Sequence, residues 1–238
     1  MKVLTIVPSR GRPELLLEMM GSWAATRRME GELLAYISPD DPKYDGYMKL
    51  GNVLPDGCTI LSGPRRYIIH SYNAITEANP GYDYYFPAND DHFCVTEGWD
   101  EKLVQLLEEK SNGWGCAMAA DKLTDWTKHP HPSGCIISKK TIDTLGYMCY
   151  PELHHIGNDV IMGKLFGNLG ILHGAHDVLI EHRHWVNGMR TFDDNYRWVY
   201  SKEEQGYGDG KVMEYLYRQY ETDYKKLKEA MAREAQER

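Results

Sequence analysis

The sequence predicts an α/β protein of three layers, in which helices cover both faces of a mainly parallel central sheet. Compact apolar runs, which are typical of buried parallel strands, alternate along the chain with segments of helical periodicity. Turns rich in proline and glycine separate these segments, as parallel crossovers require. The 238 residues are 42% hydrophobic and contain no linker, repeat or low-complexity tract, so we expect one large domain.

Composition argues against several classes of protein. A formal charge of -8 argues against a protein that coats nucleic acid through its overall charge. A local basic groove is still compatible with the sequence. The five cysteines are odd in number and contain no CxxC pair, which indicates a reducing compartment rather than a disulfide framework or zinc site. No stretch approaches the roughly 20 apolar residues of a membrane span. We therefore expect a soluble, cytoplasmic protein.

The first half of the chain is predicted to hold four strands and two helices. Pro13 fits the first turn of a helix that carries Leu16, Met20 and Trp23 at core spacing. Residues 67–79 have the same periodicity, whereas residues 38–57 are predicted to be rich in turns after a Ser-Pro-Asp-Asp-Pro strand end. The expected strands are residues 3–7, 33–37, 58–61 and the aromatic run 82–86.

The second half continues the alternation. We expect a helix from Gly98, strands over 114–120, 135–137 and 178–182, a helix ending at Leu145, and a polar loop over 121–132 that resembles an active-site loop. Asn158 or Asp159 is predicted to cap a helix over 160–166.

The end of the chain is predicted to be helical. From Lys211 onward, Met213, Leu216, Tyr217 and Tyr220 form one apolar stripe, followed by a charged and solvated end. We expect residues 1–205 to form the main domain and 206–238 a helical extension packed on it, with a frayed end.

The aromatic strand stops at Asn89, Asp90 and Asp91, where ligands collect beyond the carboxyl ends of strands in open α/β sheets. No lysine or arginine is adjacent to these acids in the sequence, so we expect the two carboxylates to repel each other. A cation would relieve that repulsion, and oxygen ligands suit Mg²⁺ or Mn²⁺. The alternative is a polar turn, for which Asn-Asp-Asp is ordinary chemistry.

Arg10 and Arg12 lie at the first strand-to-helix turn. Two cations beside a helix start make an anion cradle. The alternative is a pair of solvated arginines.

Several of these segments resemble the nucleotide-binding half of GT-A fold glycosyltransferases, especially the inverting family 2 and its relatives. The resemblance covers roughly residues 3–200, and the order of the pieces carries it. The matching pieces are the turn 7–13, the Asn-bearing helix 65–74, the aromatic strand 81–86, the DxD-type motif 89–91, Gly98-Trp99 and the late Ile180-Glu181-His182. The motif departs from a strict Asp-x-Asp at Asn89. The resemblance implies a single-domain GT-A (Rossmann-like) three-layer sandwich.

The same resemblance implies a metal-dependent transfer of a sugar from a nucleotide-sugar, expected to be a UDP-sugar, to an acceptor hydroxyl with inversion. The resemblance implies that the nucleobase of the donor lies near Arg10, Asp40 and Tyr72 or Asn73, and that its ribose lies near Asp90. The full set of implied donor-binding residues is Pro8, Arg10, Arg12, Asp40, Arg65, Tyr72, Asn73, Asn89, Asp90, Ser133 and Gly134, of which the last two should line the donor sugar.

Asp91 and His182 are the expected ligands of Mn²⁺ or Mg²⁺. A diphosphate leaving group needs a divalent or fixed cation, and an imidazole ligand favours Mn²⁺. His184 lies two residues further and shares a face with His182 if the strand continues, so the sequence leaves both open. The alternative for either is a structural histidine.

Inversion also needs a base to take the acceptor proton. By the resemblance this is an acid at the start of a late helix, which is Asp159 here. The alternative role for Asp159 is a helix cap, and Glu152, His154 and His155 are reserve candidates for the base.

Two other classes stay open. One is a catalytically inactive nucleotide-sugar-binding protein, which Asn89 permits. The other is a nucleotidyltransferase, although residues 8–12 are a poor version of the Gly-rich phosphate loop such enzymes use. The acceptor is unassigned, since a saccharide, lipid-linked sugar, protein, small molecule or modified DNA base all fit. The aromatic and basic side chains that could stack on sugars or bases are Trp126, His129, His131, Trp185, Arg190 and Trp198.

Overall fold

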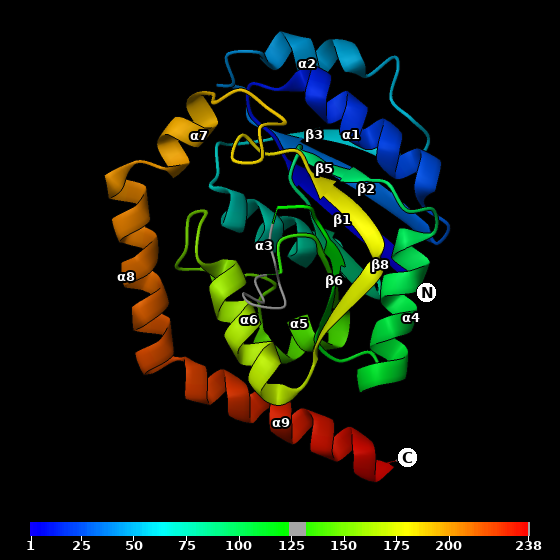
Figure 1. Ribbon diagram of the computed structural model, residues 1–238, viewed down its shortest axis with the longest axis vertical. Helices are drawn as coiled ribbons and strands as arrows, with labels where there is room; N and C mark the ends of the chain where they lie inside the picture. Colours follow the sequence, from blue (N-terminus) through cyan, green and yellow to red (C-terminus); the bar gives the residue numbers. More distant parts are fainter. Residues whose placement is uncertain (124–131, 238) are drawn as a thin grey trace.

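The computed structural model describes residues 1–123 and 132–237, and within them one eight-stranded sheet forms the centre of the molecule (Figure 1). The strands are β1 (Lys2–Pro8), β2 (Glu30–Ile37), β3 (Cys58–Ser62), β4 (Tyr84–Pro87), β5 (His92–Cys94), β6 (Cys116–Ala120), β7 (Cys135–Ser138) and β8 (Leu172–His182). Their order is β3-β2-β1-β4-β7-β6-β8-β5. Four neighbouring pairs are parallel, whereas β7 and β5 run antiparallel to their neighbours. The predicted α/β class with a mainly parallel sheet is confirmed.

Helices cover both faces of the sheet. They are α1 (Pro13–Thr26), α2 (Tyr44–Leu50), α3 (Ile68–Ala78), α4 (Trp99–Ser111), α5 (Lys139–Leu145), α6 (Asn158–Leu169), α7 (Asp194–Val199), α8 (Lys202–Arg218) and α9 (Tyr220–Glu237). Side chains alternate across β1, so that Leu4 and Ile6 join the core under α3, α5 and α6 while Val3 and Val7 join the core under α1 and α4. This alternation produces the three layers.

Helix α1 begins where the sequence predicts. Pro13 occupies its first turn, and Leu16, Met20 and Trp23 are buried against the sheet. Full burial of an apolar side chain of this size contributes about 1.5–3 kcal/mol. Trp23 Nε1 also donates a hydrogen bond of 2.8 Å to Thr5 Oγ1 on β1, which satisfies the indole N–H in the core.

Three short elements, α2, α7 and β5, were not predicted. Helix α2 lies within the segment that was expected to be rich in turns. It was missed because it has only seven residues and buries one side chain, Tyr47, which is too few to give a periodic signal. Strand β5 has three residues and follows directly on the acids; His92 pairs with His182 of β8.

The predicted caps of α6 were wrong. The helix begins at Asn158, and its N-cap residue is Gly157, whose φ of +99° favours glycine. A Cβ at Gly157 would lie 2.5 Å from Val212. The Asn158 side chain accepts a hydrogen bond from the backbone N–H of Tyr150 instead.

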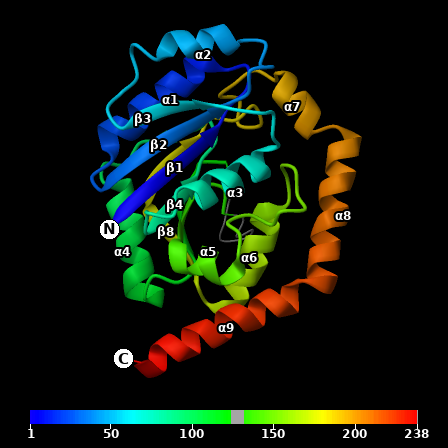
Figure 2. The same cartoon turned by 180° about the vertical axis from the view of Figure 1, so that it is seen from behind.

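Helices α7, α8 and α9 form an arc around one edge of the domain, as the two opposite views show (Figures 1 and 2). The predicted apolar stripe was half right: Leu216 and Tyr220 pack against the core, whereas Met213 is 66% and Tyr217 is 91% exposed. The buried apolar side chains are Val212 and Tyr215 on α8 and Leu227 on α9. The face that packs is set by close approach of α8 to the segment before α6, where Gly208 leaves no room for a Cβ.

Candidate functional site

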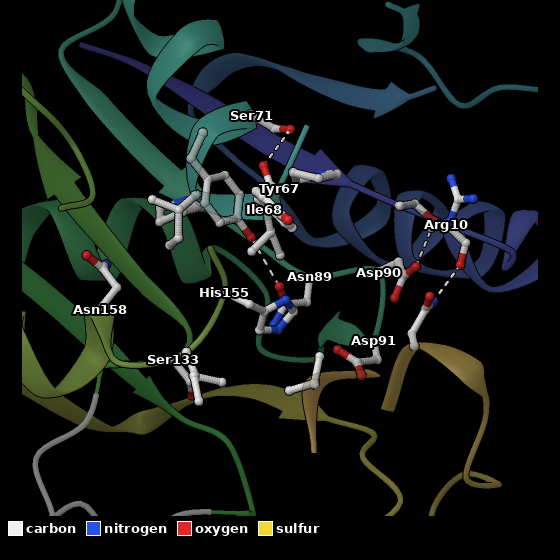
Figure 3. Close-up of a pocket in the computed structure, with 18 of the residues that line it drawn as sticks. Arg10, Tyr67, Ile68, Ser71, Asn89, Asp90, Asp91, Ser133, His155 and Asn158 are labelled. Carbon is white, nitrogen blue, oxygen red and sulfur yellow. Dashed lines mark hydrogen bonds between the residues drawn. The ribbon is translucent and has the colours of Figure 1, made fainter. Parts of the chain in front are cut away.

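A cavity of about 660 Å³ opens at the carboxyl ends of β1, β2 and β4 (Figure 3). Pro8, Ser38 and Pro87 line it from these strand ends, as expected for an open α/β sheet. Further walls come from α3, α6 and α7. Ser133 and Asn158 lie on the side of the cavity away from Asp90 and Asp91 (Figure 3).

Asp90 is buried, and both of its oxygens already have partners. Ser9 Oγ donates to Oδ2 at 2.6 Å, and Arg12 Nη1 donates to Oδ1 at 2.8 Å. Burial and the neighbouring Asp91 charge raise the pKa of Asp90 against the opposing influence of Arg12. The expectation of two acids without a basic neighbour was wrong, since Arg12 Nη1 also lies 3.8 Å from Asp91 Oδ2.

Arg12 is neither solvated nor an open anion cradle. Its side chain is 9% exposed, and its remaining nitrogens bind Asp193 with Nε–Oδ2 at 2.7 Å and Nη2–Oδ1 at 2.9 Å. The backbone N–H of Arg12 donates to Tyr47 Oη at 2.7 Å. The unpredicted helix α2 therefore helps to fix the β1–α1 turn.

Asp91, His92 and His182 gather ligand atoms that lie within 4.8 Å of one another. The Oδ2 atom of Asp91 accepts a hydrogen bond of 2.7 Å from Tyr196 Oη, whereas Oδ1 lies 3.2 Å from His182 Nε2. Within the described residues, Asp91 Oδ1, His92 Nε2 and His182 Nδ1 are buried without a hydrogen-bond partner. Orphaned polar atoms are costly in a protein interior unless something absent from the chain binds them. The donor set fits a divalent metal ion.

The charge states also suit a cation. Burial alone would raise the pKa of Asp91, but His182, His92 and Tyr196 outweigh it and hold the pKa well below its usual range. Burial and the neighbouring His182 lower the pKa of His92 to about 3, so its ring is neutral at pH 7. Because His92 Nδ1 accepts the Asn89 backbone N–H at 3.3 Å, the ring proton falls on Nε2. Asp91 and His182 are therefore better ligands than His92.

The structure separates the two histidines that the sequence left open. His182 closes β8 beside Asp91, at 3.2 Å. His184 lies beyond the end of the strand, where its Nδ1 accepts the backbone N–H of Val186 at 3.2 Å, and it is outside the Asp91 group. Burial and His182 lower the pKa of His184 to about 4.

The expected base-binding residues divide into two groups. Arg10 and Tyr72 line the cavity, whereas Asp40 and Asn73 do not. Asp40 lies at the rim, 3.3 Å from Arg10 and 3.5 Å from Arg65. The amide of Asn73 bonds the backbone of Cys149 at 2.7 and 2.9 Å, which ties α3 to the segment after α5.

The other residues expected to bind the donor also divide into those that line the cavity and one that does not. Pro8, Arg12, Arg65, Asn89, Asp90 and Ser133 line the cavity, and Gly134 does not. Asn89 Oδ1 accepts the Tyr72 hydroxyl at 3.1 Å. Ser133 Oγ donates to Asp121 at 2.8 Å. A Cβ at Gly134 would make an ordinary 3.7 Å contact with Ile180, so no close approach requires glycine there.

Of the candidate bases, Asp159 and His155 line the cavity and Glu152 does not. Asp159 lies in the first turn of α6. Burial lowers the pKa of His155 to about 4. Glu152 is exposed and pairs with Lys211 at 3.3 Å. His154, outside the cavity, stacks between Tyr67 and Tyr207 with ring centroids at 3.7 and 3.9 Å.

Half of the stacking cluster proposed for the acceptor, namely Trp126, His129 and His131, falls outside the described residues. Trp198 lines the cavity and stacks on Tyr67 at 5.7 Å, whereas Trp185 and Arg190 do not line it. Residues that sequence reasoning missed are His92, Asp193 and Tyr196. The only signal among them was Asp193, whose position before α7 is typical of a helix cap.

Comparisons with known proteins place the fold. No family model matches the sequence, and no curated protein matches it. Mannosyltransferase PcManGT from Pyrobaculum calidifontis, solved with GDP-Man and Mn²⁺, has a TM-score of 0.60 at 12% identity, over 98% of this chain and 74% of that one. S. aureus TarS 1-349, solved with UDP-GlcNAc, has a TM-score of 0.57 at 12% identity, over 93% and 73% of the two chains.

These structural neighbours are GT-A glycosyltransferases. The mixed, mostly parallel sheet of this chain matches theirs, so the chain has the GT-A fold predicted from its sequence. Among the described residues, every helix is too short or too polar to cross a membrane.

Proposed function

We propose that the chain is a metal-dependent glycosyltransferase, which moves a sugar from a nucleotide-sugar to an acceptor hydroxyl with inversion at the anomeric carbon. The observation that carries the proposal is the pair Asp91 and His182, whose Oδ1 and Nε2 atoms lie 3.2 Å apart beside a 660 Å³ cavity. Asp91 Oδ1 is buried and has no hydrogen-bond partner among the described residues. The cavity occupies the ligand-binding edge of a GT-A fold. Neighbours of this fold hold GDP-Man with Mn²⁺ and UDP-GlcNAc.

Asp91 and His182 are the residues that would hold Mn²⁺ or Mg²⁺. The imidazole favours Mn²⁺, because nitrogen ligands suit it better than Mg²⁺. When bound, the ion would offset the negative charge that develops on a departing nucleoside diphosphate.

The proposed donor is a UDP-sugar. Arg10 and Arg65 bring positive charge to the rim of the cavity, and Asp40 beside them can accept a ring N–H of the base. Asp90 can still accept a ribose hydroxyl, because a carboxylate oxygen that holds one donor has a second lone pair. Ser133, on the far side of the cavity, would contact the donor sugar.

Asp159 is the proposed general base. As the acceptor oxygen bonds to the anomeric carbon, the bond from that carbon to the diphosphate breaks and the acceptor proton passes to the Asp159 carboxylate. His155, half-buried and neutral in the same cavity, is the alternative.

The donor is tested by thermal shift with Mn²⁺ and a panel of nucleoside diphosphates. We expect UDP to raise the unfolding temperature more than GDP does. A larger response to GDP would overturn the uridine assignment. Tight nucleotide binding without hydrolysis or transfer of any nucleotide-sugar would instead favour a binding protein that lacks catalysis.

A further inference from the structure

The start of α7 is tied to the turn between β1 and α1 by side chains far apart in the sequence. Asp193 holds Arg12 by two hydrogen bonds of 2.7 and 2.9 Å, and it also caps α7 by accepting the backbone N–H groups of Asn195 and Tyr196. Asn195 Nδ2 donates to the Arg10 carbonyl at 2.6 Å. The docking of α7 therefore depends on the residues that border the acids.

Tyr196 extends this contact to the acids themselves. Its side chain is buried, and its hydroxyl donates to Asp91 Oδ2 at 2.7 Å. The Arg12 guanidinium lies 4.6 Å from the centre of its ring, and the ring of His184 packs edge-on at 4.6 Å. These neighbours leave the ring little freedom, so the direction of its hydroxyl is fixed.

The two oxygens of Asp91 are consequently different. Oδ2 is occupied by Tyr196, whereas Oδ1 is buried, has no hydrogen-bond partner among the described residues and lies 3.2 Å from His182 Nε2. Carboxylates that ligate metal ions are themselves held by outer hydrogen-bond partners, which orient the ligating atom. The arrangement presents a single oxygen toward His182.

We propose that Tyr196 is a positioning residue of the metal site, which holds Asp91 by Oδ2 so that Oδ1 and His182 together ligate a divalent cation. The inference rests on the metal site of the proposed function, but not on any transfer reaction. Because Tyr196 belongs to α7, cation binding and the docking of α7 are coupled. The cation and the docking of α7 thus stabilise each other.

The test measures Mn²⁺ binding without nucleotide, by the loss of the free-ion electron paramagnetic resonance signal. Tyr196→Phe keeps the ring and its contact with Arg12 but removes the hydroxyl, and we expect affinity for Mn²⁺ to fall about 10- to 100-fold. The matched control is Tyr215→Phe, which removes a 3.2 Å hydrogen bond to the buried Asp223 in the same C-terminal arc. It should lower the unfolding temperature and leave Mn²⁺ affinity unchanged.

Equal Mn²⁺ affinity in Tyr196→Phe and the parent would overturn the proposal while leaving the metal site intact. An equal loss of affinity in both variants would also overturn it, because the effect would then be general loosening. No Mn²⁺ binding by the parent would overturn this inference and the metal-dependent function together.

A second measurement uses the parent alone and does not depend on the variant folding. Mn²⁺ should slow amide hydrogen exchange over residues 193–199 and leave residues 220–226 of α9 unchanged. Unchanged exchange over 193–199 at saturating Mn²⁺ would contradict the coupling.

Discussion

At the scale of single residues, a substitution of Asp159 separates two versions of the proposed transfer, in which Asp159 or His155 is the general base. Asp159→Asn keeps the shape of the side chain and removes the base. It should leave donor and metal binding intact and reduce turnover about 10²-fold or more, as measured with the responding nucleotide-sugar. Glu152→Gln is the control, since Glu152 lies outside the cavity on Lys211. Normal turnover by Asp159→Asn, or a product that keeps the donor's anomeric configuration, would move the base to His155.

His155 gives a pH dependence of stability. Burial lowers its pKa in the folded state to about 4, below the ordinary 6.5. The unfolded chain therefore binds a proton that the folded chain does not, and stability falls as pH decreases from about 6.5 to about 4. Thermal unfolding of the parent should show this decrease, and His155→Gln should make it shallower. An identical slope in the variant would show that His155 does not contribute.

The site was predictable in part. The order of the segments identified Asp91 and His182, which lie 3.2 Å apart, because each follows or ends a strand. The sequence could not show that Arg12 reaches Asp90 and Asp193, which lie 78 and 181 residues away. Such long-range pairing depends on how the chain folds back on itself, and no local pattern records it.

At the scale of elements, the packing of α8 depends on one glycine. A Cβ at Gly208 would lie 2.4 Å from the side chain of Ile156, so Gly208→Ala should force a shift that costs about 1–3 kcal/mol in the free energy of unfolding. Gly206 on the same helix has nothing within 4 Å, and Gly206→Ala should stabilise by about 0.4–1 kcal/mol. Urea denaturation measures both. Equal and stabilising effects would show that α8 does not pack this closely.

Most elements were predictable, whereas the short elements α2, α7 and β5 were not. Helices α1, α3 and α4 carry apolar residues at helical spacing over several turns, and most strands coincide with a continuous apolar run. Helix α2 and strand β5 carry too few buried residues to show a period. Met213 and Tyr217 of the stripe predicted for the C-terminal helix are exposed for another reason. The face of α8 that packs is set by where Gly208 permits close contact, not by which residues are most apolar.

At the scale of the whole molecule, the mixed sheet builds the site. The parallel strands β1, β2 and β4 place their carboxyl ends around one cavity. The antiparallel pairing of β5 with β8 then brings His182 beside the acids, and α7, at the start of the C-terminal arc, forms a wall of the cavity (Figure 1). The position of the candidate metal site is thus a consequence of topology as well as of residue type.

Calorimetric titration of UDP into the parent protein, with saturating Mn²⁺ and again with EDTA, tests the metal-dependent donor site most directly. We expect measurable binding with Mn²⁺, a steep loss of affinity in EDTA, and the same loss in Asp91→Asn with Mn²⁺ present, because that variant keeps the shape but lacks the charge that offsets the cation. Equal affinity with and without EDTA in the parent would contradict the account.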